Sequence, residues 1–346
     1  MEACLIVTYR CNARCYKCNT WKYPTNRERE FTPDLIERLP DNLSFLNLTG
    51  GEPFIRNDLN QIIEIALQKA KRLVISTNGS HTGRILDTAG KYGNRVGIRI
   101  SIDGLPATND RLRGIENGFE RALRTLLALR DMGMRDIGIG VTVSERNVQD
   151  VMALYQMACA MGWEFATAAP HNSFYFHKHD NTFEDPEMIA RELERIATML
   201  LKSSRPKNWF RAYFNVGLAN RVRGRKRPLP CEVGEDVFFL DPYGDVIPCN
   251  GSDEPMIMGN LIEQTFEEIW NGEKAAEVRK KIRNCSKQCW MIGSVSAAMK
   301  KRPFIPGKWV LKNKLKMFAK NGNVSLDPVG GKGDHQYKIL FYEEKP

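Results

Sequence analysis

Six short apolar runs, each followed by a helix-like segment, constrain the fold of this chain more than any other feature. The runs cover residues 3–8, 44–48, 73–77, 96–102, 137–143 and 164–168. Their nearly continuous apolar character is typical of strands that are buried on both faces of a parallel sheet. Six strand–helix units in series predict an α/β fold with right-handed crossovers. An open (βα)6 TIM-like partial barrel and a doubly wound sheet both satisfy this pattern.

Helix signals fill the segments between the runs. Thr32-Pro33-Asp34 combines an N-cap, a proline at the first helical position and an early acid. Residues 119–127 carry apolar side chains at helical spacing, and residues 147–161 form another helical pattern. Cys159 lies in the second of these and is expected in the core. In either fold, the loops after the strands build the active site.

The pattern changes after Pro170. A polar stretch with three histidines leads into a helix predicted over residues 186–201, and a basic segment follows over residues 221–227. This change of composition indicates a second, smaller domain. We predict a barrel over residues 1–205, a small domain over residues 206–299 and a basic C-terminal tail over residues 300–346.

The formal net charge of +10 predicts an anionic partner. A phosphorylated or nucleotide-linked substrate, an acidic peptide, a membrane surface and nucleic acid are the candidates, and charge alone does not choose among them. No apolar run is long enough for a transmembrane helix, and the start of the chain lacks the features of a secretory signal. The protein is therefore expected in the cytoplasm, where clustered cysteines, which are seven of its nine, favour metal or redox chemistry over disulfides.

Three cysteines, Cys11, Cys15 and Cys18, directly follow the first predicted strand. Soft thiolates at this spacing suit an iron–sulfur cluster or zinc. Three ligands for a four-iron cluster leave one iron open to activate a small molecule, and a compact loop directs backbone N–H groups at the sulfides. The alternative is a structural zinc knuckle that takes its fourth ligand from elsewhere.

Four further motifs stand at the ends of successive predicted strands. They are Gly50-Gly51-Glu52-Pro53, Ser76-Thr77-Asn78-Gly79, Ser101-Ile102-Asp103-Gly104 and Asn109-Asp110-Arg111-Leu112-Arg113-Gly114. Together with the cysteine loop, they resemble the radical S-adenosylmethionine (SAM) superfamily and its SPASM/twitch branch, over roughly residues 3–290. The resemblance favours the partial (βα)6 barrel. Lys17, before the third cysteine, departs from a pattern in which an apolar or aromatic residue is common.

The resemblance implies a role for each motif. Cys11, Cys15 and Cys18 would hold a 4Fe-4S cluster whose open iron chelates the amino and carboxylate groups of SAM. Glu52 would accept hydrogen bonds from the SAM ammonium, and Arg113 suits the SAM carboxylate because a guanidinium matches carboxylate geometry. The predicted SAM-binding residues are Gly50, Gly51, Glu52, Pro53, Asn78, Ser101, Asp103, Arg113 and Thr142.

The resemblance also implies a chemistry. One electron from a reduced flavodoxin or ferredoxin would enter the cluster and cleave SAM to methionine and a 5′-deoxyadenosyl radical. That radical abstracts hydrogen from an unactivated C–H bond, while the protein positions the substrate and excludes water.

A second cysteine group lies near the end of the chain. Cys231 and Cys249 flank a hairpin signal, Asp-Pro-Tyr-Gly-Asp, and Cys285 and Cys289 close the group. This order resembles the SPASM or twitch module, and the shorter twitch form fits better because no cysteine follows Cys289. Four thiols would ligate an auxiliary 4Fe-4S cluster without an open iron, so its expected task is electron transfer. A Cys4 zinc site is the alternative.

Three weaker signals stand apart from these motifs. Alternating histidines over residues 177–180 are more typical of a solvated loop than of a metal site, and could line a substrate pocket. The basic segment over residues 221–227 could clamp a diphosphate or an acidic peptide, or be a solvated linker. Lysines interleaved with Trp, Leu and Phe over residues 308–320 could bind an anionic membrane surface or pack against the barrel. Nucleic-acid binding has no base-stacking module to support it.

The predicted function is a two-electron oxidation of a sugar, cyclitol or similar polar substrate, free or linked to a nucleotide or lipid. The auxiliary cluster would accept the electron. A peptide-modifying maturase or an epimerase is one alternative, and a non-catalytic iron–sulfur or zinc protein is another. No peptide-recognition domain precedes Cys11, which favours the small substrate. The Gly-Gly-Glu-Pro loop favours an enzyme, because an electron carrier needs no SAM site.

Overall fold

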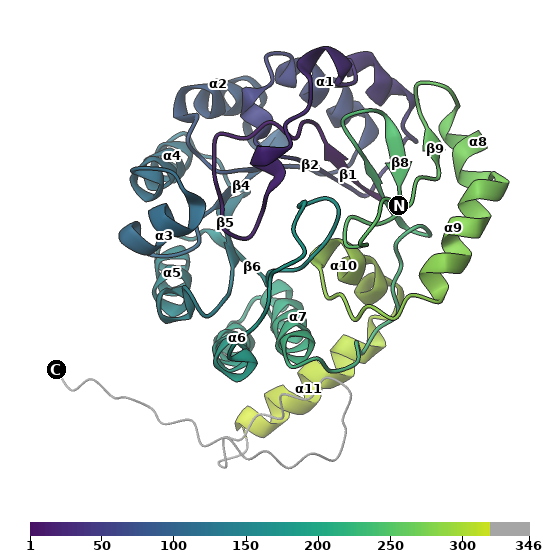
Figure 1. Cartoon of the computed structure of the whole chain (residues 1–346). Coiled ribbons are helices and arrows are strands. Elements are labelled where there is room, and N and C mark those ends of the chain that lie inside the picture. Colours follow the sequence, from purple (N-terminus) through teal and green to yellow (C-terminus); the bar gives the residue numbers. More distant parts are fainter. Residues whose placement is uncertain (319–346) are drawn as a thin grey trace.

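The six predicted strands lie side by side in one parallel sheet, in the order of the sequence (Figure 1). The computed structural model describes residues 1–318. The strands are β1 (Glu2–Ile6), β2 (Phe45–Thr49), β3 (Leu73–Thr77), β4 (Val96–Ser101), β5 (Ile137–Thr142) and β6 (Glu164–Ala168). A doubly wound sheet would reverse its strand order at a switch point. The uninterrupted order from β1 to β6 therefore identifies the partial barrel.

Helices cover the outer face of the curved sheet (Figure 1). The α-helices of residues 1–318 are α1 (Leu59–Lys69), α2 (Thr82–Tyr92), α3 (Pro106–Arg113), α4 (Gly118–Asp131), α5 (Val148–Ala160), α6 (Pro186–Lys202), α7 (Pro206–Val222), α8 (Phe266–Asn271), α9 (Glu273–Arg283), α10 (Ile292–Lys301) and α11 (Phe304–Phe318). Short 3-10 helices are η1 (Thr20–Lys22), η2 (Arg27–Arg29), η3 (Pro33–Arg38), η4 (Pro53–Ile55) and η5 (Gly93–Arg95).

The helix expected to begin at Thr32 is only the short 3-10 helix η3. The Thr32 side chain caps no backbone amide, and the next proline is Pro40. A residue before proline avoids the α conformation, so Leu39 ends the turn in extended geometry. The first crossover of the barrel is therefore built from 3-10 turns rather than from an α-helix.

The C-terminal part of the chain continues the same sheet. β7 (Val237–Leu240) pairs in parallel with β1, and β8 (Asp245–Ile247) and β9 (Gly259–Asn260) follow in antiparallel fashion. The predicted hairpin is confirmed: Asp241 Oδ1 accepts hydrogen bonds from the amides of Tyr243 and Asp245, both at 2.9 Å. The boundaries predicted at residues 205 and 299 stay predictions. Residues 319–346 of the predicted tail lie outside the described residues.

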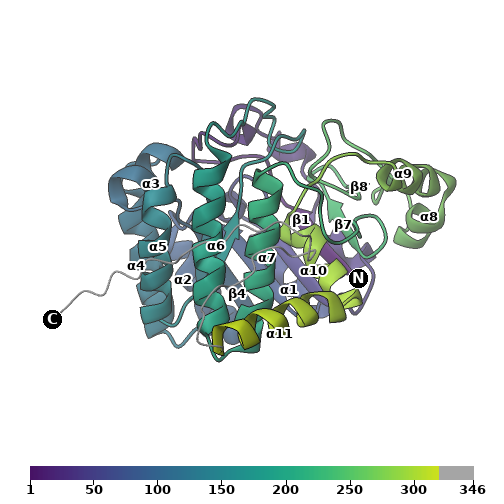
Figure 2. The ribbon, with the colours of Figure 1, turned by 90° about the horizontal axis from the view of Figure 1, so that it is seen from below.

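The barrel has two distinct ends. The loops that follow β1 to β6 gather at one end, and α11 lies across α6 and α7 at the other end (Figure 2). Within residues 1–318, every helix is too short or too polar to cross a membrane. The predicted active-site loops and α11 therefore occupy opposite ends of the molecule.

Candidate active site

The loop after β1 carries Cys11, Cys15 and Cys18 at the carboxyl end of the sheet. Its backbone points at two of the sulfurs: the Ala13 amide donates to Cys11 Sγ and the Thr20 amide to Cys18 Sγ, both at 3.4 Å. Such donors offset negative charge on thiolates and sulfides. Across the described residues, no three His, Cys, Asp or Glu side chains converge at the spacing of a single metal ion.

Electrostatics of the loop indicate what it needs to bind. Burial raises the pKa of Cys11 to about 12 and also raises the pKa of Cys18, and Cys15 adds to both rises. Arg113 lowers the pKa of Cys11. Buried thiols of this kind stay protonated at neutral pH unless positive charge is added. Iron supplies that charge, and three soft sulfurs with converging amides fit a cluster.

The Gly50-Gly51 pair lets the loop after β2 lie against the loop after β1. A Cβ at Gly50 would lie 2.3 Å from the Thr8 carbonyl oxygen, and one at Gly51 would lie 2.2 Å from the Arg10 carbonyl oxygen. Gly50 also has a φ of 143°, which side chains rarely adopt. The structure thus requires both glycines for contact between the chain's own loops. Their contact with SAM stays a prediction.

Glu52 is a fully buried carboxylate between the second and third loops. Its Oε1 accepts from the Phe54 amide at 3.2 Å and the Thr77 hydroxyl at 2.7 Å, and its Oε2 accepts from the Asn78 amide at 2.7 Å. Burial raises the pKa of Glu52, and these donors oppose the rise. A carboxylate has about four acceptor positions, so Oε2 has capacity for one more donor. The predicted bond from the SAM ammonium fits this position.

Asn78 joins the third loop to the cysteine loop. Its Nδ2 donates to Asn12 Oδ1 at 2.7 Å, and its Oδ1 accepts from the Ser80 amide at 2.9 Å and hydroxyl at 2.6 Å. Pro53 is the first residue of η4 and follows Glu52 directly. Both residues shape the loops around the predicted SAM site, and their contact with SAM stays a prediction.

Asp103, after β4, holds two cationic side chains. Lys17 Nζ donates to both carboxylate oxygens at 2.8 and 2.7 Å, and Arg113 Nη1 donates to Oδ2 at 2.8 Å. The Thr142 amide adds a fourth bond at 2.8 Å. Burial would raise the pKa of Asp103, but Lys17 and Arg113 outweigh it and lower that pKa. Four donors use about all the acceptor positions of a carboxylate, so little capacity remains for a ribose hydroxyl.

Arg113 is the last residue of α3, next to the cysteine loop. Burial lowers its pKa, whereas Cys15, Asp103 and Cys11 raise it, and the rise prevails. Its Nε is buried without a hydrogen-bond partner among residues 1–318. A buried cation with an unused donor is suited to an anionic ligand, as predicted for the SAM carboxylate.

Ser101 and Thr142 are the last residues of β4 and β5, and both are half-buried. Sequence reasoning missed Asn147, whose Nδ2 donates to the Asp103 carbonyl oxygen at 2.6 Å and the Thr142 carbonyl oxygen at 2.9 Å. The signal for Asn147 was its place directly before α5, where asparagine commonly ends a loop. The signal for Lys17 was its departure from the motif.

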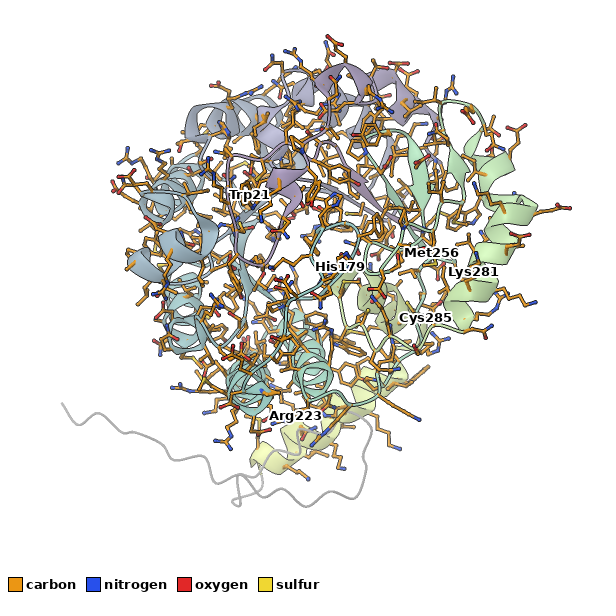
Figure 3. All side chains as sticks on the ribbon, in the orientation of Figure 1. Trp21, His179, Arg223, Met256, Lys281 and Cys285 are labelled. Atoms are coloured by element: carbon orange, nitrogen blue, oxygen red, sulfur yellow. The ribbon has the colours of Figure 1, made fainter. Side chains whose placement is uncertain are left out.

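The second cysteine group gathers around Gly251. A Cβ at Gly251 would lie 3.6 Å from both Cys249 Sγ and Cys289 Sγ, and its amide donates to Cys249 Sγ at 3.1 Å. Burial, together with the neighbouring thiols of Cys231, Cys289 and Cys285, raises the pKa of Cys249 to about 12. Cys285 is exposed just after α9 (Figure 3), and the other three are half-buried. Four neighbouring thiols fit the predicted iron–sulfur site.

One loop, residues 171–181 between β6 and α6, contacts both cysteine regions. The Asn19 amide, directly after Cys18, donates to the Phe176 carbonyl oxygen at 2.8 Å. The Phe174 amide donates to the Ser252 carbonyl oxygen at 3.0 Å, beside Gly251. The two thiol sites are therefore connected through a single short segment.

Comparison with known families decides what this arrangement is. The radical SAM superfamily matches residues 5–158, which hold the cysteine loop and the predicted motifs that follow β2, β3 and β4. The iron–sulfur cluster-binding SPASM domain matches residues 231–290, which hold all four cysteines of the second group. The chain belongs to the radical SAM superfamily. Its cofactors are accordingly SAM with a 4Fe-4S cluster, and further iron–sulfur ligation in the SPASM domain.

Relatives of this radical SAM protein have several activities. The AdoMet-dependent heme synthase of Methanosarcina barkeri is 27% identical over 80% of this chain and 83% of its own. The mycofactocin maturase MftC of Mycolicibacterium smegmatis is 24% identical over 79% of this chain and 71% of its own. The SAM-bound structure of SuiB from Streptococcus suis matches 84% of this chain and 72% of SuiB, with a TM-score of 0.61 at 14% identity. This last likeness concerns the fold.

The basic segment over residues 221–227 of this radical SAM protein is solvated only in part: Arg225 and Lys226 are exposed, whereas Arg223 and Arg227 have partners in the chain. Arg223 binds Glu187 of α6 at 2.8 Å, and Arg227 donates to the Cys289 carbonyl oxygen at 3.0 Å. These arginines fasten α7 and the second cysteine group to the rest of the chain. The sequence did not indicate these contacts, because Glu187 and Cys289 are distant from the segment along the chain.

Two further expectations concern exposure. Cys159, predicted in the core, is exposed, because Ala158 is the buried position at that turn of α5. Of the alternating histidines, His177 stacks on Tyr23, with 4.5 Å between the ring centroids. His179 is exposed and lies in the middle of the molecule as Figure 3 shows it, surrounded by the helices and strands of the barrel.

His171 is a half-buried titratable group that the predicted chemistry does not use. Burial, together with the nearby charge of Arg221, lowers the pKa of His171 to about 3. Its Nε2 has no hydrogen-bond partner in the described part of the chain. The imidazole is therefore neutral in the folded protein.

Proposed function

We propose that this protein is a radical SAM oxidoreductase that removes a hydrogen atom and then a second electron from a polar, anionic substrate. The observation that carries the proposal is the link between the two thiol sites. The first site follows β1, and the second flanks the β7–β8 hairpin, whose strand β7 pairs with β1. The loop over residues 171–181 contacts both thiol sites.

At the first site, the chain binds and orients its cofactors. Cys11, Cys15 and Cys18 would hold the cluster, Glu52 would accept a hydrogen bond from the SAM ammonium, and Arg113 would bind the carboxylate. When bound, the cluster and SAM supply a one-electron reductive cleavage that removes a hydrogen atom from a substrate C–H bond. A reduced flavodoxin or ferredoxin is the proposed electron donor.

At the second site, Cys231, Cys249, Cys285 and Cys289 would hold a cluster without an open iron, which supplies a place for one electron. The substrate would lose a hydrogen atom at the first site, then one electron to the second site and one proton to solvent. The balance is a two-electron oxidation.

Oxidation is favoured over epimerisation by the two cysteines outside both groups. An epimerase needs a hydrogen donor, commonly a thiol, near the substrate. Cys4 lies within β1, where the Asn47 amide contacts its sulfur at 3.8 Å. Cys159 is exposed on α5, near the end of a helix on the outer face. Neither thiol belongs to the loops at the carboxyl end of the sheet.

The proposed substrate is a sugar, cyclitol or similar polar molecule, and the net charge of +10 favours an anionic one. A tetrapyrrole is the second candidate, because the heme synthase of Methanosarcina barkeri matches most of this chain and most of its own length. A peptide is the third, because maturases such as MftC also match.

The test begins with anaerobic reconstitution with iron and sulfide. Dithionite and SAM should then yield 5′-deoxyadenosine, and Cys15→Ala should abolish that product. Deuterated phosphosugars, cyclitols, iron porphyrins and peptides are then supplied in turn, and deuterium transfer into 5′-deoxyadenosine identifies the substrate class. Zinc in place of iron, or SAM cleavage that survives Cys15→Ala, would refute the proposal.

A further inference from the structure

The outward face of α11 combines exposed apolar and basic side chains. Phe304, Leu311 and Leu315 have exposed fractions of 87%, 62% and 60%. Exposed lysines recur between them at helical spacing. These are Lys308, Lys312 and Lys316. Such alternation of large apolar groups and lysines on one helix face is typical of helices that lie in a membrane interface.

The inward face of α11 fixes the helix to the barrel. Trp309 and Val310 are buried, and the Trp309 ring lies 5.5 Å from the Tyr213 ring of α7. Lys314 Nζ donates to the Ser203 carbonyl oxygen at 3.1 Å, at the end of α6. Because these contacts hold the inward face of α11 against α6 and α7, the outward face has a fixed orientation on the protein surface.

The stretch of sequence that contains this face carries charge of one sign. The sequence contains no acidic residue between Glu277 and Asp327. Lysines and arginines at the end of α10 are paired, as Lys301 is with Glu232 at 2.9 Å. By contrast, the three lysines of the outward face have no carboxylate partner within residues 1–318.

We propose that the outward face of α11 binds the surface of an anionic lipid bilayer, with the helix lying flat in the headgroup region. Phe304, Leu311 and Leu315 would enter the boundary of the acyl chains, and the lysines would contact lipid phosphates. α11 lies at the end of the barrel opposite the cysteine loop (Figure 2). The bound protein would therefore keep its active-site loops facing the water and open to an electron donor.

A second copy of the chain is a poorer occupant of this face. Symmetric dimers use the same patch on both subunits. Such a contact would bring the three lysines of one α11 against those of the other, with no acidic residue to separate them. Repulsion between like charges opposes that dimer, whereas an anionic bilayer satisfies the lysines and the apolar groups together.

The test uses vesicle co-sedimentation of the full reconstituted chain. Vesicles of phosphatidylcholine with phosphatidylglycerol should bind the protein, and vesicles of phosphatidylcholine alone should bind it weakly. Lys308→Gln/Lys312→Gln/Lys316→Gln should weaken binding by about a hundredfold, and high salt should mimic that loss. Leu311→Ser/Leu315→Ser should weaken binding by about tenfold or more.

Matched controls change similar residues elsewhere. Lys226→Gln/Lys274→Gln/Lys280→Gln removes three exposed lysines, and Leu105→Ser/Ile262→Ser removes two exposed apolar side chains. Both controls should bind vesicles as the unchanged chain does. Iron content and SAM cleavage without vesicles should stay unchanged in every variant, which separates this test from that of the proposed function. Equal binding to both vesicle types would overturn the proposal. It would also be overturned if the protein bound no vesicles and instead formed a dimer, or a complex with an acidic protein, that the α11 variants abolish.

Discussion

Lys17 Nζ lies 2.8 and 2.7 Å from the two carboxylate oxygens of Asp103, 86 residues further along the chain. Lys17 stands between Cys15 and Cys18, and Asp103 follows β4. The pair therefore fastens the cysteine loop across the carboxyl end of the sheet. It also explains the basic residue at a motif position that is commonly apolar or aromatic.

Replacing Lys17 with methionine should lower the free energy of unfolding by about 1–3 kcal/mol, because Asp103 loses one of two cations while staying buried. The effect should be largest above about pH 4, since the pKa of Asp103 is lowered in the folded state and its contribution disappears as the carboxylate is protonated. Urea unfolding under anaerobic conditions measures it. Lys69→Met, which breaks the exposed pair with Asp41, should cost less than about 1 kcal/mol. Equal losses in the two variants would contradict the role of Lys17.

Replacing Glu52 with glutamine should lower stability by about 1–3 kcal/mol and weaken SAM binding at least about tenfold. Both carboxylate oxygens of Glu52 accept hydrogen bonds from the chain. In either orientation, the amide NH2 of the glutamine would therefore point at a hydrogen-bond donor and lose that bond. Urea unfolding and equilibrium dialysis of SAM measure the two effects. The exposed Glu64→Gln, which breaks a pair with Lys91, is the control. A Glu52→Gln protein with unchanged SAM affinity would show that this carboxylate does not contact SAM.

Replacing Cys289 with alanine should lower the iron content from about eight to about four atoms per chain. The loss is expected because Cys289 lies beside Cys249 at Gly251, away from the first cysteine loop. SAM cleavage should persist, while substrate oxidation stops. Iron analysis and 5′-deoxyadenosine measurement check these outcomes. The exposed Cys159→Ser should keep its full iron content, and a Cys289→Ala protein that does so too would remove Cys289 from the ligand set.

Acid should destabilise the protein through His171. Its pKa is about 3 in the folded protein and 6.5 as the ordinary value, so the unfolded chain binds the proton first as the pH falls. The free energy of unfolding should therefore drop by about 1 kcal/mol between about pH 7 and about pH 5.5. His171→Gln should remove that part of the pH dependence in urea titrations, and the exposed His179→Gln should not. An unchanged pH dependence in His171→Gln would show that the imidazole titrates normally.

Local sequence patterns predicted much of the fold. β3 (Leu73–Thr77) and β6 (Glu164–Ala168) have the predicted bounds, because each apolar run is bordered by polar or glycine-containing turns. The spacing of Cys11, Cys15 and Cys18 and the motif at Gly50 also indicate the family from the sequence alone. These signals are readable because strand burial and ligand spacing depend on near neighbours in the chain.

The amino-acid sequence by itself determined the alternation of strands and helices, the two thiol groups and the membership of the radical SAM superfamily. Only the tertiary structure decided between a partial barrel and a doubly wound sheet, because that choice depends on which strands pair. It also decided that Lys17 meets Asp103, that Arg223 meets Glu187, and that Cys159 faces outward. Periodicity records which face of an element is buried, whereas contacts between distant residues arise only when the elements pack together.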